Sequence, residues 1–183
     1  MSYVTAKGRR PVRSWRVPKS YRPPKDRRIL LLLPCSRTKP YSLSPFHRAV
    51  AASLRGLDSN VHVCTISEEV GVVPRELEHE VPYYDTYPDQ SGIKRASKEL
   101  AKYVSRHSRH YSGVAAYATS RTFRAIVKQA ALASGTNIVL LPREGRFEAS
   151  SAFFEFMKKR TALRRHVSMV TRRTGYPPSK ASI

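Results

Sequence analysis

The sequence contains little cysteine and no long hydrophobic run. Its two cysteines, Cys35 and Cys64, cannot form the disulfide framework of a small secreted domain, and no CxxC pair suggests a zinc site. No stretch approaches the ~20 apolar residues that span a membrane. The arginine-rich first residues also lack the apolar core of a secretory signal. We therefore expect a protein of the reducing cytoplasm, with no metal, no cofactor and no membrane contact.

Acidic residues are also scarce. The 183 residues include 13 Asp and Glu against 34 Lys and Arg, which gives a formal net charge of +21. Most of the excess lies at the two ends: residues 1–28 hold ten cations and one acid, and residues 157–183 hold eight cations and no acid. Such a charge points to a polyanionic partner, which we expect to be RNA rather than DNA. The composition predicts a basic RNA-binding arm over 1–28, a globular domain over 29–156 and a basic extension over 157–183.

Aromatic residues stand among the cations of the arm. Trp15 and Tyr21 suit stacking on bases beside phosphate neutralisation. The four prolines of the arm exclude a continuous helix, so a solvated tail is the competing interpretation. The cations of the last segment are too dense to serve only as helix-end charges. The residues predicted to contact RNA are Arg9, Arg10, Arg13, Trp15, Arg16, Lys19, Tyr21, Arg22, Lys158, Lys159, Arg160, Arg164, Arg165, Arg172 and Arg173.

Between the basic ends, strand patterns alternate with helical patterns. Residues 29–33 are apolar throughout, as in a buried parallel strand, and Ser44-Pro45 supplies the N-cap and first residue of a helix. An acidic connection rich in Pro and Tyr follows the second strand. We expect further strands at 61–66, 113–118 and 136–141, the acidic connection at 67–92, and further helices at 93–108, 120–135 and from 151. The alternation predicts an α/β fold of three layers, a mostly parallel sheet flanked by helices.

The densest set of reactive side chains follows the first strand. Residues 34–47 include a thiol, a lysine, a phenol and an imidazole, at a strand end where open α/β sheets bind their ligands. The spacing Pro-Cys, three residues, Lys-Pro-Tyr, two residues, Ser, two residues, His resembles the motif of the archaeosine synthase core domain. A weaker match to a second block of that family lies at residues 71–78 and 83–85. The resemblance covers roughly residues 29–150.

The resemblance implies an archaeal enzyme of tRNA modification. Members of the family join an amine donor, lysine in the known case, to a nitrile-bearing deazaguanine already installed in tRNA. They are longer than this chain and carry transglycosylase-like and RNA-binding domains for which it has no room. The candidate catalytic residues are Cys35, Lys39, His47, Glu76 and Asp85, and the other candidate ligand contacts are Ser36, Tyr41, Ser44 and Arg75.

Cys35 is the candidate nucleophile. Positive charge from Arg37, Lys39 and the helix N-terminus is expected to lower the pKa of its thiol. A thiolate attacks a nitrile to give a thioimidate, which an amine can then displace. The competing interpretation is a small buried residue that ends a strand. His47, on the first helical turn, is expected to be neutral and to act as a base, an RNA contact or a packing residue. The acids of the 67–92 connection suit an ammonium group or form a solvated loop.

Two functions from different classes are open at this point. The first is an RNA-binding protein of the translation apparatus, associated with the ribosome through rRNA and ribosomal proteins. The small size, the cationic ends and the aromatic residues of the arm favour it. The second is a tRNA-modifying enzyme of the amidinotransferase type, which the intact motif favours. We take the first as the prediction and the second as its alternative, so the sequence leaves open whether the chain is an enzyme.

Overall fold

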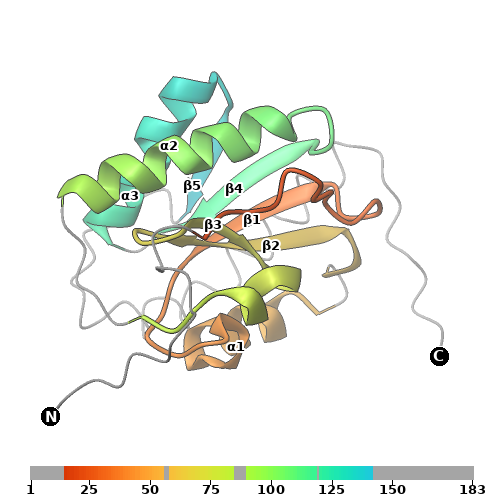
Figure 1. Ribbon diagram of the computed structural model, residues 1–183. Helices are drawn as coiled ribbons and strands as arrows, with labels where there is room; N and C mark the ends of the chain where they lie inside the picture. Colours follow the sequence, from red (N-terminus) through yellow and green to blue (C-terminus); the bar gives the residue numbers. More distant parts are fainter. Residues whose placement is uncertain (1–14, 56–57, 85–89, 119, 142–183) are drawn as a thin grey trace, which may run out of the picture.

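The computed structural model describes residues 15–55, 58–84, 90–118 and 120–141. Within these ranges the chain forms a five-stranded sheet with helices packed on both faces (Figure 1). Several predicted features lie outside the described residues: Arg9, Arg10, Arg13, Asp85, the helix expected from 151 and all RNA contacts predicted between Lys158 and Arg173. No helix in the described ranges is long and apolar enough to cross a membrane.

The sheet has the strand order β3-β2-β1-β4-β5. Its strands are β1 (Ile29–Pro34), β2 (Val61–Ser67), β3 (Gly71–Pro74), β4 (Gly113–Tyr117) and β5 (Ile138–Leu141). All neighbouring pairs are parallel except β2 with β3, which is antiparallel. The continuous apolar run of β1 is explained by its central place, because both of its faces are covered. The predicted α/β fold is confirmed.

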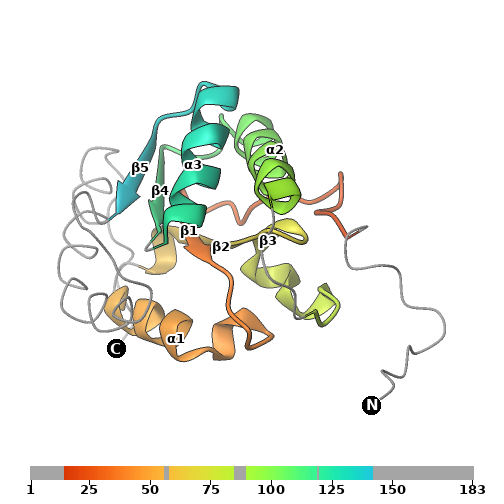
Figure 2. The ribbon, with the colours of Figure 1, turned by 90° about the vertical axis from the view of Figure 1, so that its left-hand side faces the viewer.

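Helices cover the two faces of the sheet unequally (Figure 2). The α-helices are α1 (Pro45–Ser53) on one face, and α2 (Gln90–Arg106) and α3 (Arg121–Ser134) on the other, and the 3₁₀ helices are η2 (Tyr41–Leu43), η3 (Asp58–Asn60) and η4 (Arg75–Glu80). Ser44 and Ser120 accept hydrogen bonds from backbone N–H groups of the first turns of α1 and α3, as N-caps do. Gly135 ends α3 in the left-handed conformation. All three helix-end signals were readable in the sequence.

Alternate residues of β1 supply two separate cores. Leu30 and Leu32 pack with Ile66 under α2 and α3, whereas Leu31 and Leu33 pack against α1. Because successive side chains of a strand point to opposite faces, a run of six buried or nearly buried residues fills both layers. The parallel strands also bring their carboxyl ends to one edge of the sheet, which places the loop after β1 beside the end of β2.

The acidic connection contains structure that the sequence pattern did not reveal. After β2 the chain turns back at residues 68–70 and forms the antiparallel edge strand β3 before η4 and α2. Gly71 has a φ of +82°, and a Cβ there would lie 2.7 Å from the Cβ of Glu99 on α2. Only glycine therefore suits both the backbone and the close helix. The hairpin and α2 are held against each other at this contact.

The described part of the predicted arm lies against the domain. Val17 and Tyr21 pack on the core under α2 and α3, and the carbonyl of Arg28 accepts a 2.8 Å hydrogen bond from the Ser112 N–H. Trp15 packs on a third cluster that also contains Tyr41. Residues 15–28 thus run across the α2 face of the sheet and lead into β1.

Candidate functional site

The loop between β1 and α1 is closed by hydrogen bonds at both of its ends. Ser44 caps α1 by accepting the His47 N–H at 3.2 Å. The His47 ring, which is 1% exposed, donates from Nε2 to the Pro34 carbonyl at 2.9 Å. Burial lowers the pKa of His47, so the ring is neutral at physiological pH, as expected. Its described contacts make His47 the residue that holds the start of α1 to the end of β1.

Cys35 lies between the ends of β1 and β2. Its N–H donates to the Ile66 carbonyl at 2.9 Å, and its Sγ donates to Glu68 Oε2 at 3.5 Å. Burial, followed by the charge and the hydrogen bond of Glu68, raises the pKa of the Cys35 thiol far above its ordinary value. Lys39 opposes this rise without overcoming it. The expected lowering of this pKa is therefore corrected: the site holds a protonated thiol, because desolvation outweighs the nearby cation.

Glu68 is the carboxyl group that the sequence analysis did not single out. It follows β2 directly, is 8% exposed, and lies beside Cys35 because β1 and β2 are parallel neighbours. Burial raises its pKa as well. The carbonyl of Glu68 accepts a 2.8 Å hydrogen bond from Arg95, and the Glu69 carboxylate lies 3.7 Å from the same guanidinium. Helix α2 thus fixes the backbone that carries Glu68.

Lys39 is held by the second block of the motif. Its Nζ donates to the Tyr84 carbonyl at 2.8 Å and to the Ser36 carbonyl at 3.3 Å, and it lies 4.1 Å from the centroid of the Tyr84 ring. These contacts hold the half-buried Lys39 near enough to Cys35 for its charge to act on the thiol. Lys39 therefore joins two segments, 36–39 and 83–84, that are far apart in the sequence.

Three hydroxyl groups form a chain behind the loop. Tyr84 lies 2.5 Å from the Tyr41 hydroxyl and 2.5 Å from that of Ser67, at the end of β2. Burial raises the pKa of both phenols, so they act as neutral hydrogen-bonding groups. Ser42 donates its N–H to Glu78 at 3.0 Å and its hydroxyl to the same carboxylate. Glu78 thereby caps η2, a structural use of an acid that the sequence left as a solvated or ammonium-binding group.

Glu76 is not brought to Cys35, which corrects its place among the candidate catalytic residues. It lies at the opposite, amino-terminal end of the parallel strands, where its carboxylate is 3.1 Å from His62 Nε2 and 3.3 Å from the Tyr21 hydroxyl. The reason is the antiparallel return of β3, which carries the chain back along β2. Arg75 lines a cavity of 350 Å³ beside α1, with Arg27, and its charge contributes to lowering the pKa of His47.

The described RNA-contact candidates divide by burial. Trp15 and Tyr21 are half-buried against the domain, and the Tyr21 hydroxyl is engaged with His62 and Glu76, so the ring of Tyr21 is placed for packing rather than for stacking on a base. The cations Arg16, Lys19 and Arg22 are exposed. Within the described ranges, no group of three or more His, Cys, Asp or Glu residues is arranged to hold a metal ion.

Sequence reasoning missed Glu68, Ser67 and Tyr84 as site residues. Each comes from a segment other than the motif loop, so spacing within the loop gave no sign of them. A signal existed: two polar residues follow the second strand directly, and adjacent parallel strands end at the same edge of a sheet. Tyr84 belonged to the weaker second block, which the structure brings to Lys39 and Tyr41.

Comparison with known proteins places this geometry in a family. The model of the domain of unknown function DUF5591 matches residues 12–159. Archaeosine synthase subunit alpha of Methanosarcina acetivorans is 35% identical over 130 residues, which cover 68% of this chain and 20% of that protein. The corresponding protein of Thermococcus kodakarensis is 39% identical over 109 residues, which cover 54% and 19%. The chain thus spans about a fifth of the length of these relatives.

A solved structure is also similar. The crystal structure of AF0587, a protein of unknown function, matches with a TM-score of 0.49 and 23% identity, over 72% of this chain and 44% of that one. The family match covers most of the chain and includes the whole of the described sheet together with the loop of Cys35. This chain belongs to the DUF5591 family, as an archaeosine-synthase-like domain.

Proposed function

We propose that the chain acts in tRNA modification, with Cys35 as the nucleophile that attacks the nitrile of a deazaguanine base in tRNA. The observation that carries this proposal is the 3.5 Å contact between the half-buried Cys35 thiol and the buried Glu68 carboxyl group at the carboxyl edge of the sheet. The names of the relatives support the substrate class, and the complete motif supports the chemistry. Because the chain matches only about a fifth of the length of each relative, we propose this as the role of one domain within a larger activity.

The first step is the addition of a thiol to a nitrile. Sγ of Cys35 forms a bond to the nitrile carbon, Glu68 takes the thiol proton and passes it to the nitrile nitrogen, and a thioimidate results. A carboxylate whose pKa is raised suits this transfer, because it is a stronger base than an ordinary carboxylate. No oxidant, reductant or metal is needed, since the atoms of the thiol and the nitrile account for the whole product.

The second step is displacement by an amine. The neutral amine of lysine bonds to the thioimidate carbon, the C–S bond breaks, and the sulfur leaves as a thiolate that regains a proton from the attacking nitrogen. The product is an amidine, and Cys35 returns as a thiol. Lys39 is held close enough to oppose the raised pKa of Cys35, so it stabilises the leaving thiolate. Its own amine is engaged with the Tyr84 carbonyl, which suits a fixed charge rather than a nucleophile.

The test is to trap the covalent intermediate. The full chain is mixed with the free nitrile-bearing deazaguanine and, separately, with tRNA that carries it. With the free base, we expect the mass of the chain to rise by the mass of one base. With the tRNA, we expect a covalent protein–tRNA complex that survives a denaturing gel. Added lysine should release both adducts. Cys35→Ala should form neither, whereas Cys64→Ala, which removes the other thiol, should form both. A wild-type chain that forms no adduct with either substrate contradicts the proposal.

A second candidate is an RNA-binding protein of the translation apparatus, associated with rRNA and ribosomal proteins. The charge of the two ends, with ten cations over residues 1–28 and eight over 157–183, favours it. In that case the loop after β1 keeps the motif residues but catalyses no reaction. Sucrose-gradient sedimentation of native lysate separates the candidates: stoichiometric migration with a ribosomal subunit after a salt wash, together with no adduct at Cys35, supports the second. Either function belongs to the cytoplasm.

A further inference from the structure

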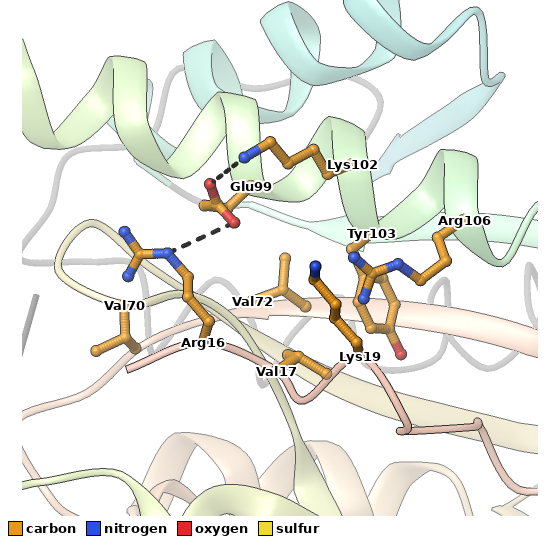
Figure 3. A pocket seen from close by; sticks show the side chains of 9 residues that line it. All are labelled: Arg16, Val17, Lys19, Val70, Val72, Glu99, Lys102, Tyr103 and Arg106. Carbon is orange, nitrogen blue, oxygen red and sulfur yellow. Dashed lines mark hydrogen bonds and ion pairs between the residues drawn. The ribbon is translucent and has the colours of Figure 1, made fainter. Parts of the chain in front are cut away.

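A cavity of 230 Å³ lies between residues 16–19 and α2 (Figure 3). Its floor is apolar and is formed by Val17, Val72 and the ring of Tyr103. Cations stand around this floor: Arg16 and Lys19 on the incoming segment, and Lys102 and Arg106 on the helix. Glu99 is the one carboxylate among the lining residues, 3.6 Å from Arg16 and 2.9 Å from Lys102. The cavity thus combines an apolar floor with a cationic rim.

A second hollow, of 580 Å³, continues from the first. The two share Arg106, and the second is also lined by Arg22, Lys25 and Arg109, with no carboxylate among its lining residues. His107 lies in its wall; it is 6% exposed, and its Nε2 has no hydrogen-bond partner in the described structure. We call the two hollows together the basic groove. It runs along the side of α2 that faces residues 16–25.

The spacing of the cations brings them to one surface. The segment supplies Arg16, Lys19, Arg22 and Lys25, one at every third residue, and the helix side supplies Lys102, Arg106 and Arg109, four and three residues apart. Lys102 and Arg106 lie on one face of α2, and Arg109 follows in the turn after the helix. Charge at the end of α2 complements the helix dipole, which accounts for Arg106 and Arg109 but not for the four cations on the facing segment. Two cationic segments packed together repel each other, so the arrangement suits an anion between them.

We propose that the basic groove binds the phosphate backbone of a single-stranded RNA segment, with the apolar floor against its riboses and bases. A track of cations beside apolar and aromatic surface is the form that such sites take. One end of the groove lies at Arg16, next to Trp15, which packs on the same cluster as Cys35 and Tyr84. RNA in the groove is thereby led toward the loop after β1. This inference rests on the proposed function and names how its tRNA substrate is held.

The test is the salt dependence of RNA binding by the full chain. The probes are a fluorescein-labelled single strand of fifteen nucleotides and an unmodified tRNA transcript, followed by anisotropy. The variant Lys19→Gln/Arg106→Gln removes two exposed cations of the groove, and Arg48→Gln/Lys128→Gln removes two exposed cations from α1 and α3. On the single strand, the groove variant should lower the slope of log K against log salt by about 1.4, at about 0.7 for each lost phosphate contact. Equal slopes in the two variants overturn the proposal.

A change of opposite sign sharpens the test. Glu99→Gln removes the one carboxylate that lines the groove, so we expect RNA to bind about two- to fivefold more tightly. Unchanged RNA binding by Glu99→Gln would show that the bound RNA does not pass this carboxylate, and the proposal would fail. Adduct formation at Cys35 with the free base requires no groove. If the groove variant forms the adduct and also binds RNA as the wild type does, the proposed function is therefore supported and this inference is wrong.

Discussion

The two ends of the parallel strands each hold a polar cluster around one buried residue, and the clusters have opposite electrostatic character. At the amino-terminal end, His62 is fully buried between Tyr111, 2.5 Å from Nδ1, and Glu76, 3.1 Å from Nε2. At the carboxyl end, Cys35 and Glu68 face each other at 3.5 Å. Each cluster combines one buried residue, His62 or Glu68, with a more accessible partner, Glu76 or Cys35, so burial alone does not distinguish them.

The two clusters differ in how the protein shifts the pKa values of their groups. Burial opposes the charged form of His62, but Cys64 and Glu76 outweigh it and raise the pKa to about 9, while the Glu76 pKa is lowered. The amino-terminal pair is thus charged at neutral pH. At the other end, burial raises the pKa of both Cys35 and Glu68. One end therefore holds an ion pair, and the other keeps a transferable proton beside the proposed nucleophile.

The largest expected effect is on chemistry at the carboxyl end. Glu68→Gln keeps the size of the side chain but removes its ability to accept the thiol proton. We expect adduct formation with the free nitrile base to slow by about 10²–10³-fold, in the range of general acid–base catalysis, with little change in unfolding free energy. Single-turnover mass spectrometry measures the rate. Glu80→Gln, an exposed acid of η4, is the control. A slowing of less than about threefold would mean that Glu68 is not the proton acceptor.

The next effect is on stability at the amino-terminal end. His62→Gln removes a fully buried ring and leaves the Glu76 carboxylate and the Tyr111 hydroxyl without that partner. We expect the unfolding free energy to fall by on the order of 2–4 kcal/mol. Urea denaturation measures it. The rate of adduct formation by the folded fraction should not change. A variant with normal stability and slow adduct formation would reverse the roles assigned to the two ends.

The pH dependence of stability tests the same contrast. The His62 pKa rises on folding from an ordinary value near 6.5 to about 9, so its stabilising effect is complete below pH 6.5 and is lost as the pH rises through 9. We expect a loss on the order of 2–4 kcal/mol between pH 6.5 and 10. Cys35, whose pKa is also raised, adds a loss above its ordinary pKa. The difference between wild type and His62→Gln therefore isolates His62, and curves that stay parallel over this range would contradict its assignment.

Most of the fold was predictable from local signals. The apolar run of β1, the Ser44 and Ser120 caps and Gly135 each depend on neighbouring residues, so the sequence displays them directly. Strand β3 was missed because it has four residues, too few for a period, and begins and ends with Gly and Pro, which usually mark loops. Its pairing with β2 is a tertiary effect that no sequence pattern within the connection indicates.

The candidate site was predictable only within its own loop. The motif identified Cys35, Lys39 and Tyr41, which the structure brings together, but Glu68 reaches them from the next strand. The pKa of Cys35 was predicted in the wrong direction because adjacent cations are visible in a sequence and desolvation is not. Glu76 was assigned to the site from its place in the second block, and the turn at Gly71 sends it to the other end of the strands.

The smallest effect concerns the segment that joins the basic arm to the amino-terminal cluster. Tyr21→Phe removes one hydroxyl, which lies 3.2 Å from His62 Nε2 and 3.3 Å from Glu76, and keeps the packing of the ring. We expect a loss of about 0.5–1.5 kcal/mol in unfolding free energy, the usual value of one hydrogen bond and somewhat more if the ion pair depends on it. Tyr83→Phe, on a ring that is 68% exposed, should cost nothing measurable. Equal effects of the two variants would mean that residues 15–28 do not belong to the folded domain, and the basic groove would lose one of its walls.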